Sequence, residues 1–324
     1  MPKEIVGIGA ANVDIMGESA ARLVMEDSNP GILSVSVGGV TRNVCENTAR
    51  LGLPTRLITT VGEDMYGEKI RSWCQECGIA TDSFITLPGK NSSSYVSIHR
   101  SDGEMAVALS DMRILQELTP ARLEPMRDKL SAAAAIVVDG CLPQETLRYI
   151  IRTFGGSVPI FADPVSTAYA RRMRPVLRGI DTLKPNRLEA EILSGRSIRC
   201  EADYFRAAEG ILAQGVRRVI ISAGSRGCYY ADNMGQRLWS RTRPLQQVEN
   251  ATGAGDSFMA GLLYSAAQRY WLGDTMDFAM GAALAALQAR TTINPAISPE
   301  LIWQLVREQK RPRTPVIPTG LTGK

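Results

Sequence analysis

The segment AAAAIVVDG at residues 132–140 is followed, after a stretch of helical length, by VPIFADP at residues 158–164. Each segment is a short run of small and β-branched apolar residues that ends in Asp followed by Gly or Pro. This pattern is typical of a buried strand and the turn after it. Two such strands separated by one helix indicate a parallel β-α-β unit, because the chain must cross back over the sheet before a parallel neighbour can form. The stretch therefore predicts an α/β fold.

The same alternation continues on both sides of this unit. Residues 4–9 (EIVGIG), 181–186 (DTLKPN) and 217–224 (RRVIISAG) are further apolar runs that end in turn residues, with helical segments between them. Strands that alternate with helices predict a mostly parallel sheet that helices cover on both faces.

Two segments differ from this alternation. Residues 31–37 (GILSVSV) and 92–110 (SSSYVSIHRSDGEMAVALS) alternate polar and apolar residues with period two, and the turn Ser101-Asp102-Gly103 divides the second segment. Such alternation predicts strands with one solvated face, and the second segment is expected to be a hairpin. We expect a small antiparallel sheet that acts as a lid over a site at the strand ends.

Composition and charge narrow the class of protein. The 324 residues carry 37 basic and 33 acidic side chains, a balance that gives no basic face for nucleic acid. No apolar run approaches the length of about 18 residues that a membrane span needs. Cys74 and Cys77 form a CxxC without a second ligand pair at zinc spacing, so we expect buried thiols near a helix end that Gly78 closes. We expect a cytoplasmic protein without nucleic-acid or membrane partners.

The strongest chemical signal is ENATGAGDSFMAG at residues 249–261. Gly253, Ala254 and Gly255 are small enough for successive backbone N–H groups to approach one anion. The residues that follow have a helical pattern, so the loop lies at the positive end of a helix. Asp256, in the first turn, suits a general base beside a phosphoryl group. An aspartate at this place also suits a simple helix cap.

Other nucleotide-binding motifs are missing from the sequence. The chain has neither the GxxxxGK[ST] pattern of a P-loop nor the HRD and DFG motifs of protein kinases. Gly7-Ile8-Gly9 resembles the start of a dinucleotide fingerprint, but Asn12 stands where that fingerprint needs a small residue. We therefore set a nicotinamide-dependent dehydrogenase aside.

The TGAGD loop resembles the C-terminal signature of the ribokinase-like (PfkB) family of carbohydrate and nucleoside kinases, and the family's other motifs occur in the same order. They are ANVD with Asn12 and Asp14, GGVTRN with Gly38, Gly39 and Asn43, KPNRLE with Lys184, Asn186 and Glu189, and SAGSRG with Ser222, Gly224 and Gly227. The motifs extend from residue 7 to about residue 261, so the resemblance covers nearly the whole chain.

The resemblance implies a ribokinase-like three-layer α/β/α sandwich with a small β-sheet lid. It implies one kinase domain at residues 1–310, with lid segments at about 15–37 and 91–112, followed by a flexible tail at 311–324. The implied activity is transfer of the γ-phosphate of ATP to a hydroxyl. The exposed edge of the lid sheet leads us to expect a homodimer formed through it.

The family motifs also imply roles for single residues in substrate binding and catalysis. A sugar diol needs acceptors and donors, which a carboxylate and an amide supply. The implied substrate-binding residues are Asn12, Asp14, Gly38, Gly39 and Asn43, and the implied catalytic residues are Asp256 as the base with Gly253, Ala254 and Gly255.

ATP and Mg²⁺ are the implied cofactors. The implied ATP-binding residues are Lys184, Asn186, Ser222, Gly224, Gly227 and Thr252, and Mg²⁺ with its waters is implied at Asn186 and Glu189. Many family members carry Asp where this chain has Asn250, and that Asp helps to bind a monovalent cation. The missing charge weakens the prediction of a K⁺ requirement.

Within the family, several segments are similar to bacterial pseudouridine kinases, among them DSNPG (27–31), NSSSY (91–95), GEMAVALSDM (103–112) and ADPVS (162–166). This likeness implies a reaction at the 5′-hydroxyl of pseudouridine, with the uracil base against Ser93, Ser94 and Tyr95. The alternatives are another substrate for the same fold, such as ribose, adenosine, a keto-deoxy sugar acid or a fructose phosphate, and a non-catalytic nucleoside sensor.

Overall fold

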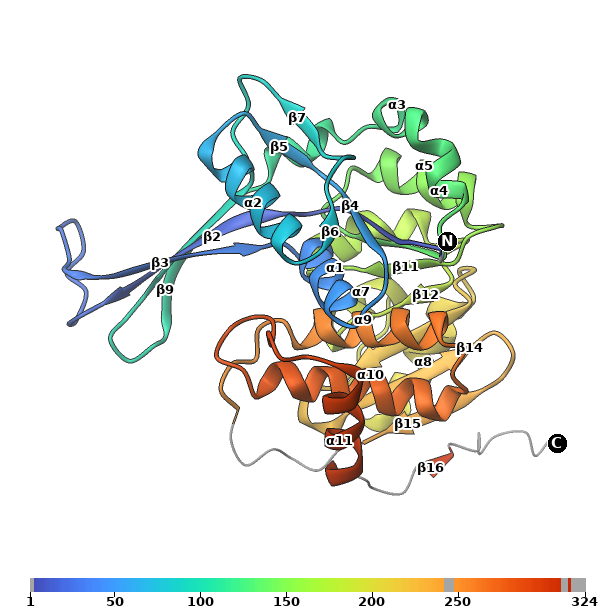
Figure 1. The fold of residues 1–324 in the computed structure, drawn as a ribbon. Helices are drawn as coiled ribbons and strands as arrows, with labels where there is room; N and C mark the ends of the chain where they lie inside the picture. The colour runs from blue at the N-terminus through green and yellow to red at the C-terminus, as the bar shows by residue number, and fades with distance from the viewer. Residues whose placement is uncertain (1–2, 242–247, 310–313, 316–324) are drawn as a thin grey trace.

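A computed structural model describes residues 3–241, 248–309 and 314–315, and within these residues a ten-stranded sheet forms the centre of the molecule (Figure 1). Its parallel strands, in spatial order, are β13 (Arg218–Ser222), β12 (Thr182–Leu183), β11 (Ile160–Asp163), β10 (Ala135–Asp139), β1 (Ile5–Ile8), β4 (Thr55–Ile58) and β6 (Ile79–Ala80). Beyond β13 the antiparallel strands β14 (Cys228–Asp232), β15 (Arg237–Ser240) and β16 (Thr314–Pro315) extend one edge.

Helices cover both faces of this sheet, as predicted. One face packs on α1 (Val40–Arg50), α9 (Ala254–Ala267), α10 (Leu272–Leu287) and α11 (Pro299–Gln309). The other packs on α5 (Gln144–Phe154), α6 (Thr167–Met173), α7 (Arg187–Ser194) and α8 (Glu201–Leu212). On β10, Val137 contributes to the first core and Ile136 and Val138 to the second. Since successive side chains alternate between faces, a continuous apolar run is what a strand buried on both sides requires.

A separate four-stranded sheet projects from this body (Figure 1). Its spatial order is β3 (Gly31–Gly38), β2 (Asn12–Ser19), β8 (Ser94–His99) and β9 (Met105–Asp111), and we call it the lid sheet. The predicted hairpin at residues 92–110 forms as the antiparallel pair of β8 and β9, and β2 and β3 are also antiparallel. The two pairs join through parallel pairing of β2 with β8, so the sheet is mixed where we expected antiparallel pairing alone. The connection between β2 and β8 contains α1 and α2 (Met65–Glu76), and so long a connection permits parallel pairing.

Short elements complete the fold. They are the paired strands β5 (Thr60–Gly62) and β7 (Ile85–Leu87), the helices α3 (Pro120–Leu123) and α4 (Arg127–Ser131), and the 3₁₀ turns η1 (Arg113–Glu117), η2 (Glu124–Met126), η3 (Arg174–Val176) and η4 (Gly224–Arg226). Apart from Thr314–Pro315, the predicted flexible tail lies outside the described residues. Across residues 3–241 and 248–309, no helix combines the length and apolar composition that a bilayer span requires.

The cysteines of the CxxC lie at the end of α2. Cys74 is buried, whereas Cys77 is half-buried at the C-cap, so the prediction of two buried thiols holds in full only for Cys74. Gly78 follows with φ 77°, the left-handed conformation that ends many helices. Neither thiol is part of a disulfide.

Candidate active site

The glycine-rich loop leads directly into α9. Gly253 is the N-cap with φ 82°, and a Cβ there would collide with the carbonyl oxygen of Thr292, so only glycine fits. Because Gly253 has no side chain to accept from them, the amides of the first turn remain directed at the space before the helix. The helix dipole adds positive potential at the same point. The arrangement is that of an anion cradle.

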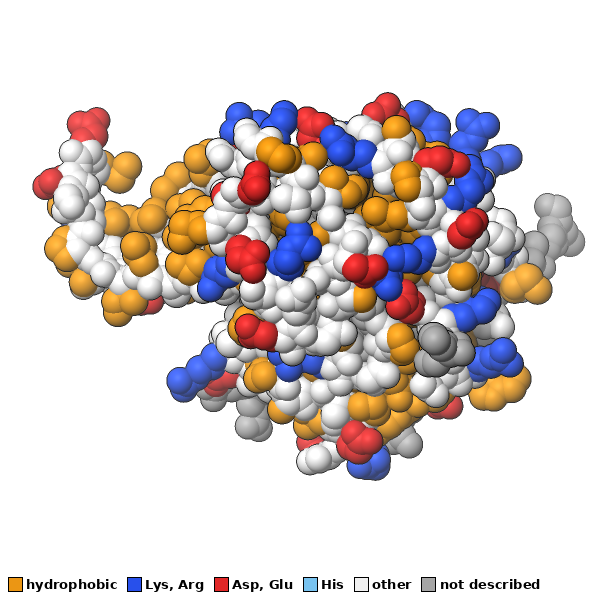
Figure 2. Space-filling view, turned by 45° about the horizontal axis from the view of Figure 1, so that its top comes forward, with side chains coloured by type: hydrophobic (Ala, Val, Ile, Leu, Met, Phe, Trp, Pro, Cys, Tyr) orange, Lys and Arg blue, Asp and Glu red, His pale blue; other side chains and the backbone are white. Residues whose placement is uncertain are grey.

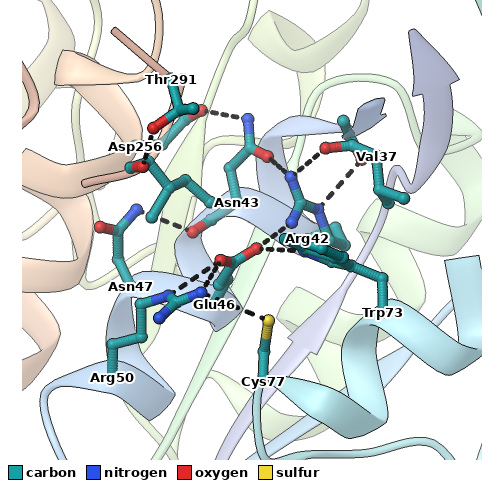
Figure 3. Close-up of polar contacts among 12 residues, drawn as sticks. Val37, Arg42, Asn43, Glu46, Asn47, Arg50, Trp73, Cys77, Asp256 and Thr291 are labelled. Atoms are coloured by element: carbon teal, nitrogen blue, oxygen red, sulfur yellow. Dashed lines mark hydrogen bonds and ion pairs between the residues drawn. The ribbon is translucent and has the colours of Figure 1, made fainter. Parts of the chain in front are cut away.

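Asp256 lies in this first turn and is buried. Its Oδ2 accepts a hydrogen bond of 2.8 Å from Nδ2 of Asn43, which comes from α1 on the far side of the site (Figure 3). The next residue of α9, Ser257, makes a second contact with α1, since its Oγ donates to Asn47 Oδ1 at 3.1 Å. The structure therefore brings the predicted base and the predicted substrate-binding amide into direct contact.

Burial raises the pKa of Asp256 to about 7, and the negative charge of Asp163 contributes to the rise. The hydrogen bond from Asn43 and the positive charges of Lys184 and Arg42 oppose it. A carboxylate with a pKa near neutrality can accept a proton and release it again at physiological pH, which is the property that general-base catalysis uses.

Lys184 places a positive charge beside the cradle. Its Nζ lies 2.8 Å from Oδ2 of Asp163, and both side chains are buried. A Cβ built on Gly255 would lie 3.3 Å from the same Nζ, so the ammonium reaches the N-terminus of α9. Burial lowers the pKa of Lys184, but the charges of Asp163, Glu189 and Asp256 outweigh burial and raise it. The lysine therefore stays charged beside the N-terminus of α9.

Asn186 and Glu189 form a capping box at the start of α7. Asn186 Oδ1 accepts from the Glu189 amide at 3.0 Å, and Glu189 Oε2 accepts from the Asn186 amide at 2.9 Å. Burial and Asp163 raise the pKa of Glu189 to about 7 against the opposing effects of Asn186 and Lys184. In the described part of the chain, no three His, Cys, Asp or Glu side chains converge as a metal site. Asn186 and Glu189 offer oxygen atoms, the ligand type that Mg²⁺ prefers.

The remaining predicted ATP-binding residues lie at two places. Ser222 pairs with Asn186 in an isolated parallel bridge, which brings the end of β13 beside α7. Gly227, with φ 94°, packs where a Cβ would meet the Ser240 carbonyl oxygen, while the surroundings of Gly224 are open. Thr252 is exposed in the loop before α9, and its amide donates to Oδ1 of Asn250 at 2.8 Å.

The predicted sugar-binding residues lie at the base of the lid sheet. Asn12 Nδ2 donates to Asp14 Oδ1 at 2.6 Å, and a Cβ on Gly38 would collide with the Asp14 carboxylate. Gly39, with φ 102°, fits closely against the Ala10 carbonyl oxygen. Burial raises the pKa of Asp14, while Asn12 and Arg42 oppose the rise. Gly38 therefore makes room for the Asp14 carboxylate on β2, while Gly39 allows close approach to the loop after β1.

Tyr95 and Ser93 have different surroundings. Tyr95 on β8 is the register partner of Asp14 on β2, so the two side chains share a face of the lid sheet, and the Tyr95 hydroxyl donates to the Met105 sulfur at 3.5 Å. Ser93 is 1% exposed, and its hydroxyl has no hydrogen-bond partner among the described residues. Ser94 is half-buried at the first position of β8.

Sequence reasoning missed two aspartates that end neighbouring strands. Asp139 Oδ2 accepts from the Ala10 amide at 2.8 Å and from Thr41 Oγ1 at 2.6 Å, which ties the loop after β1 to the start of α1. Asp163 holds Lys184. The signal was available, because polar residues at the carboxyl ends of parallel strands point toward the site of an open α/β sheet.

Comparisons with known proteins agree along nearly the whole chain. A family model described as pfkB family carbohydrate kinase matches residues 2–299. The chain is 38% identical to the pseudouridine kinase of Escherichia coli K12 over 93% of this chain and 96% of the relative. It is 32% identical to YeiI, an uncharacterized sugar kinase of the same strain, over 93% of this chain and 83% of the relative. A ribokinase of Arabidopsis thaliana, solved with ribose and ATP, has the same fold with a TM-score of 0.85 and 22% identity, and the match covers 95% of this chain and 99% of that one.

Proposed function

The chain belongs to the pfkB family of carbohydrate kinases and is a phosphotransferase with an alcohol acceptor, and from this premise we propose that it transfers the γ-phosphate of ATP to the 5′-hydroxyl of pseudouridine. The similarity to a pseudouridine kinase over nearly the full length of both chains is the observation that carries the choice of substrate. The product would be pseudouridine 5′-phosphate.

The substrate is held at the base of the lid sheet. Asp14 accepts hydrogen bonds from the ribose hydroxyls, the backbone at Gly39 approaches closely, and the Asn43 amide donates. This pose directs the 5′-hydroxyl toward Asp256, since Asn43 already contacts that carboxylate at 2.8 Å. Uracil rests against Tyr95, the register partner of Asp14, and the unpaired hydroxyl of Ser93 supplies a polar contact to the base. The lid sheet excludes water that would compete for the phosphoryl group.

Proton transfer falls to Asp256. The carboxylate accepts the 5′-hydroxyl proton as the new P–O bond forms and the bond to the ADP oxygen breaks. The first-turn amides at Ala254, Gly255 and Asp256 donate to the phosphoryl oxygens in flight. The Lys184 ammonium, buried beside Gly255, offsets the same negative charge.

The nucleotide would lie along Thr252, Ser222, Gly224 and Gly227. Hard oxygen donors at Asn186 and Glu189 suit a hydrated Mg²⁺, which would neutralise phosphate charge. The capping box fixes the positions of both side chains. Because burial and Asp163 raise the pKa of Glu189 to about 7, its charge changes near neutral pH. A K⁺ requirement stays a prediction, which the missing carboxylate charge at Asn250 weakens. Asn250 Oδ1 accepts a hydrogen bond from the Thr252 amide.

A second candidate is a different sugar or nucleoside, which the 32% identity to the sugar kinase YeiI favours. An assay of ATP consumption with pseudouridine, uridine, adenosine, ribose and fructose 6-phosphate separates the two. We expect turnover on pseudouridine at least about tenfold above the others, since a site built around the hydrogen bonds of one base rejects analogues. Turnover on ribose without turnover on pseudouridine would transfer the proposal to the second candidate.

The matched control for this assay is Asp256→Asn, which keeps the shape of the side chain. We expect the rate to fall by roughly 10²–10⁴, the usual contribution of a general base. ATP binding, measured by calorimetry, should stay within about 1 kcal/mol because the amide cradle is unchanged. A variant that turns over at the wild-type rate would remove Asp256 from the role of base.

We also propose that the chain forms a homodimer through the lid sheet. Asp14, Ser36, Tyr95 and Ser110 share one face of the sheet, the polar face that carries the predicted substrate contacts. The opposite face is apolar and largely exposed, with Leu33, Val35, Val107 and Leu109 joined by the half-buried Ile15, Val96 and Ile98. Hydrophobic side chains gather along this projecting arm in Figure 2. A second copy presents an equally uncharged face of the same shape, so that two lid sheets can pack face to face.

A further inference from the structure

Arg42 is a charged residue that the proposed mechanism does not use, yet it is only 1% exposed. It lies in the first turn of α1, directly before Asn43. Its guanidinium donates to the Glu46 carboxylate, to Oδ1 of Asn43, and to the carbonyl oxygens of Val37 and Gly38 (Figure 3). A buried arginine costs free energy unless such partners satisfy it, and here every partner belongs to the site or supports it.

The contact with Asn43 decides which way that side chain faces. A guanidinium can only donate, so the atom of Asn43 that faces Arg42 must be its oxygen. The amide nitrogen is then left on the other side, where it donates to Asp256 at 2.8 Å. The reversed amide would direct two donors at each other and an oxygen at a carboxylate. Arg42 therefore selects the orientation of Asn43 that serves the base.

The contacts with Val37 and Gly38 reach the lid sheet. These two residues end β3, where the lid sheet continues into α1. Arg42 Nε donates to the Gly38 carbonyl oxygen at 3.3 Å. Gly38 in turn makes room for the Asp14 carboxylate. Arg42 thus contacts both the end of β3 in the lid sheet and the Asn43 amide. Through Asn43 it also affects the proposed catalytic base, Asp256.

Arg42 itself is held in place by a buried pair. Glu46, one turn along α1, accepts from Arg42, from Arg50 Nε at 2.9 Å and from Trp73 Nε1 at 2.9 Å. Burial raises the pKa of Glu46, but Arg42, Trp73 and Arg50 outweigh burial and lower it, so the carboxylate is charged. Glu46 keeps two donors if Arg42 is replaced.

We propose that Arg42 is a positioning residue of the phosphoryl-transfer site, which fixes the Asn43 amide toward Asp256 and fastens the end of β3 to α1. This inference rests on the proposed kinase function but not on the choice of pseudouridine as substrate.

The positive charge of Arg42 also affects the pKa of Asp256. The groups that face Asp256 are Asp163 from β11, Lys184 after β12, and Arg42 and Asn43 from α1. Burial and Asp163 raise the pKa of Asp256, and Arg42 is one of the groups that oppose the rise. Loss of the Arg42 charge should therefore raise this pKa further, and the base would become active only at a higher pH.

The test compares steady-state kinetics of Arg42→Gln and Arg42→Lys with wild type over pH 5–9. For Arg42→Gln we expect kcat to fall by about 10- to 100-fold, because a misplaced contact group has costs of this size. We also expect the acid limb of kcat/KM to move up by roughly one pH unit. Arg42→Lys keeps the positive charge but lacks the planar set of guanidinium donors. Its kcat should therefore fall as much as that of Arg42→Gln, while the acid limb of kcat/KM stays at the wild-type pH.

Arg50→Gln is the matched control, since Arg50 contacts Glu46 from the same helix but not Asn43. We expect its kcat within twofold of wild type and an unchanged pH profile. An Arg42→Gln variant with the kinetics of Arg50→Gln would overturn the inference. If Arg42→Gln is insoluble, a wild-type kcat in Arg42→Lys overturns it instead. Failure of the wild type on pseudouridine refutes only the substrate proposal, and the series is then run on the alcohol that it phosphorylates.

Discussion

Asp256 has an unusual environment for an aspartate, because Asp163 and Glu189 share its surroundings with a single lysine. Burial and the charge of Asp163 raise its pKa to about 7, so below that pH the carboxyl group is mostly protonated and would not serve as the proposed base. We expect kcat/KM to rise tenfold per pH unit up to about pH 7 and to level off above it. Initial rates measured from pH 5 to pH 9 check this. An acid limb near pH 4, the ordinary range of an aspartate, would contradict it.

The same burial has an effect on stability. The folded protein binds a proton at Asp256 that the unfolded chain releases from about pH 4 upward. Stability that is present below this range is lost as the pH rises through about 7. Asp256→Asn removes the titration, so we expect its free energy of unfolding, relative to wild type, to increase by about 2 kcal/mol between pH 5 and pH 8. Urea unfolding at both pH values measures the difference, and an equal value at both would argue against a buried carboxylate.

Single residues also show what the sequence could predict. The sequence could predict that a helix begins after Gly253 with Asp256 in its first turn, because small residues before a helical pattern favour close approach of its backbone amides to an anion. Arg42 could not, because an arginine in a helix usually lies at the surface. Its burial depends on Glu46 one turn away and on Trp73 from another helix, and no local pattern brings these three together.

Among the elements, α7 combines a structural and a proposed chemical role at its first turn. Glu189→Gln should retain the capping box, because glutamine serves in it as well as glutamate. We expect its free energy of unfolding to equal or exceed that of wild type, while the Mg²⁺ concentration for half-maximal rate rises about tenfold. Asn186→Ala is the matched variant, which should lose about 1 kcal/mol of stability with the cap. If Glu189→Gln leaves the Mg²⁺ dependence unchanged, the residue is only a cap.

The lid sheet shows the limit of prediction for elements. Period-two alternation and a turn at residues 101–103 predicted the hairpin of β8 and β9, because both signals are local. The parallel pairing of β2 with β8 was not predicted, since it depends on how the long connection through α1 and α2 returns the chain. The alternation predicted that the sheet has one polar and one apolar face. The face on which Asp14 lies could be assigned only from the strand register in the structure.

At the scale of the whole molecule, the proposed dimer can be tested on opposite faces of one strand. Leu33 and Ile32 are neighbours on β3, exposed by 73% and 74%, but they lie on the apolar and the polar face respectively. We expect Leu33→Lys to raise the dimer dissociation constant by at least about 100-fold, since a lysine would be buried in an apolar interface. Ile32→Lys should leave it unchanged. Sedimentation velocity at micromolar concentration measures both, and a monomeric wild type would refute the proposal.

The parallel part of the central sheet was predictable because strands such as β1, β10 and β11 are apolar runs that must be buried on both faces. Its antiparallel edge of β14, β15 and β16 was not predicted. Gly235, with φ 90°, lies in the turn between β14 and β15. The turn residues Asp232, Asn233 and Gly235 are a local signal in the sequence that could have predicted this hairpin.

The bond between Asn43 and Asp256 joins residues 213 positions apart. A ribosome therefore finishes the proposed sugar-binding residues long before it adds the proposed phosphate-binding loop. A message truncated anywhere between the two codons would yield a polypeptide without the proposed catalytic base. The contact can therefore form only after synthesis has reached the first turn of α9.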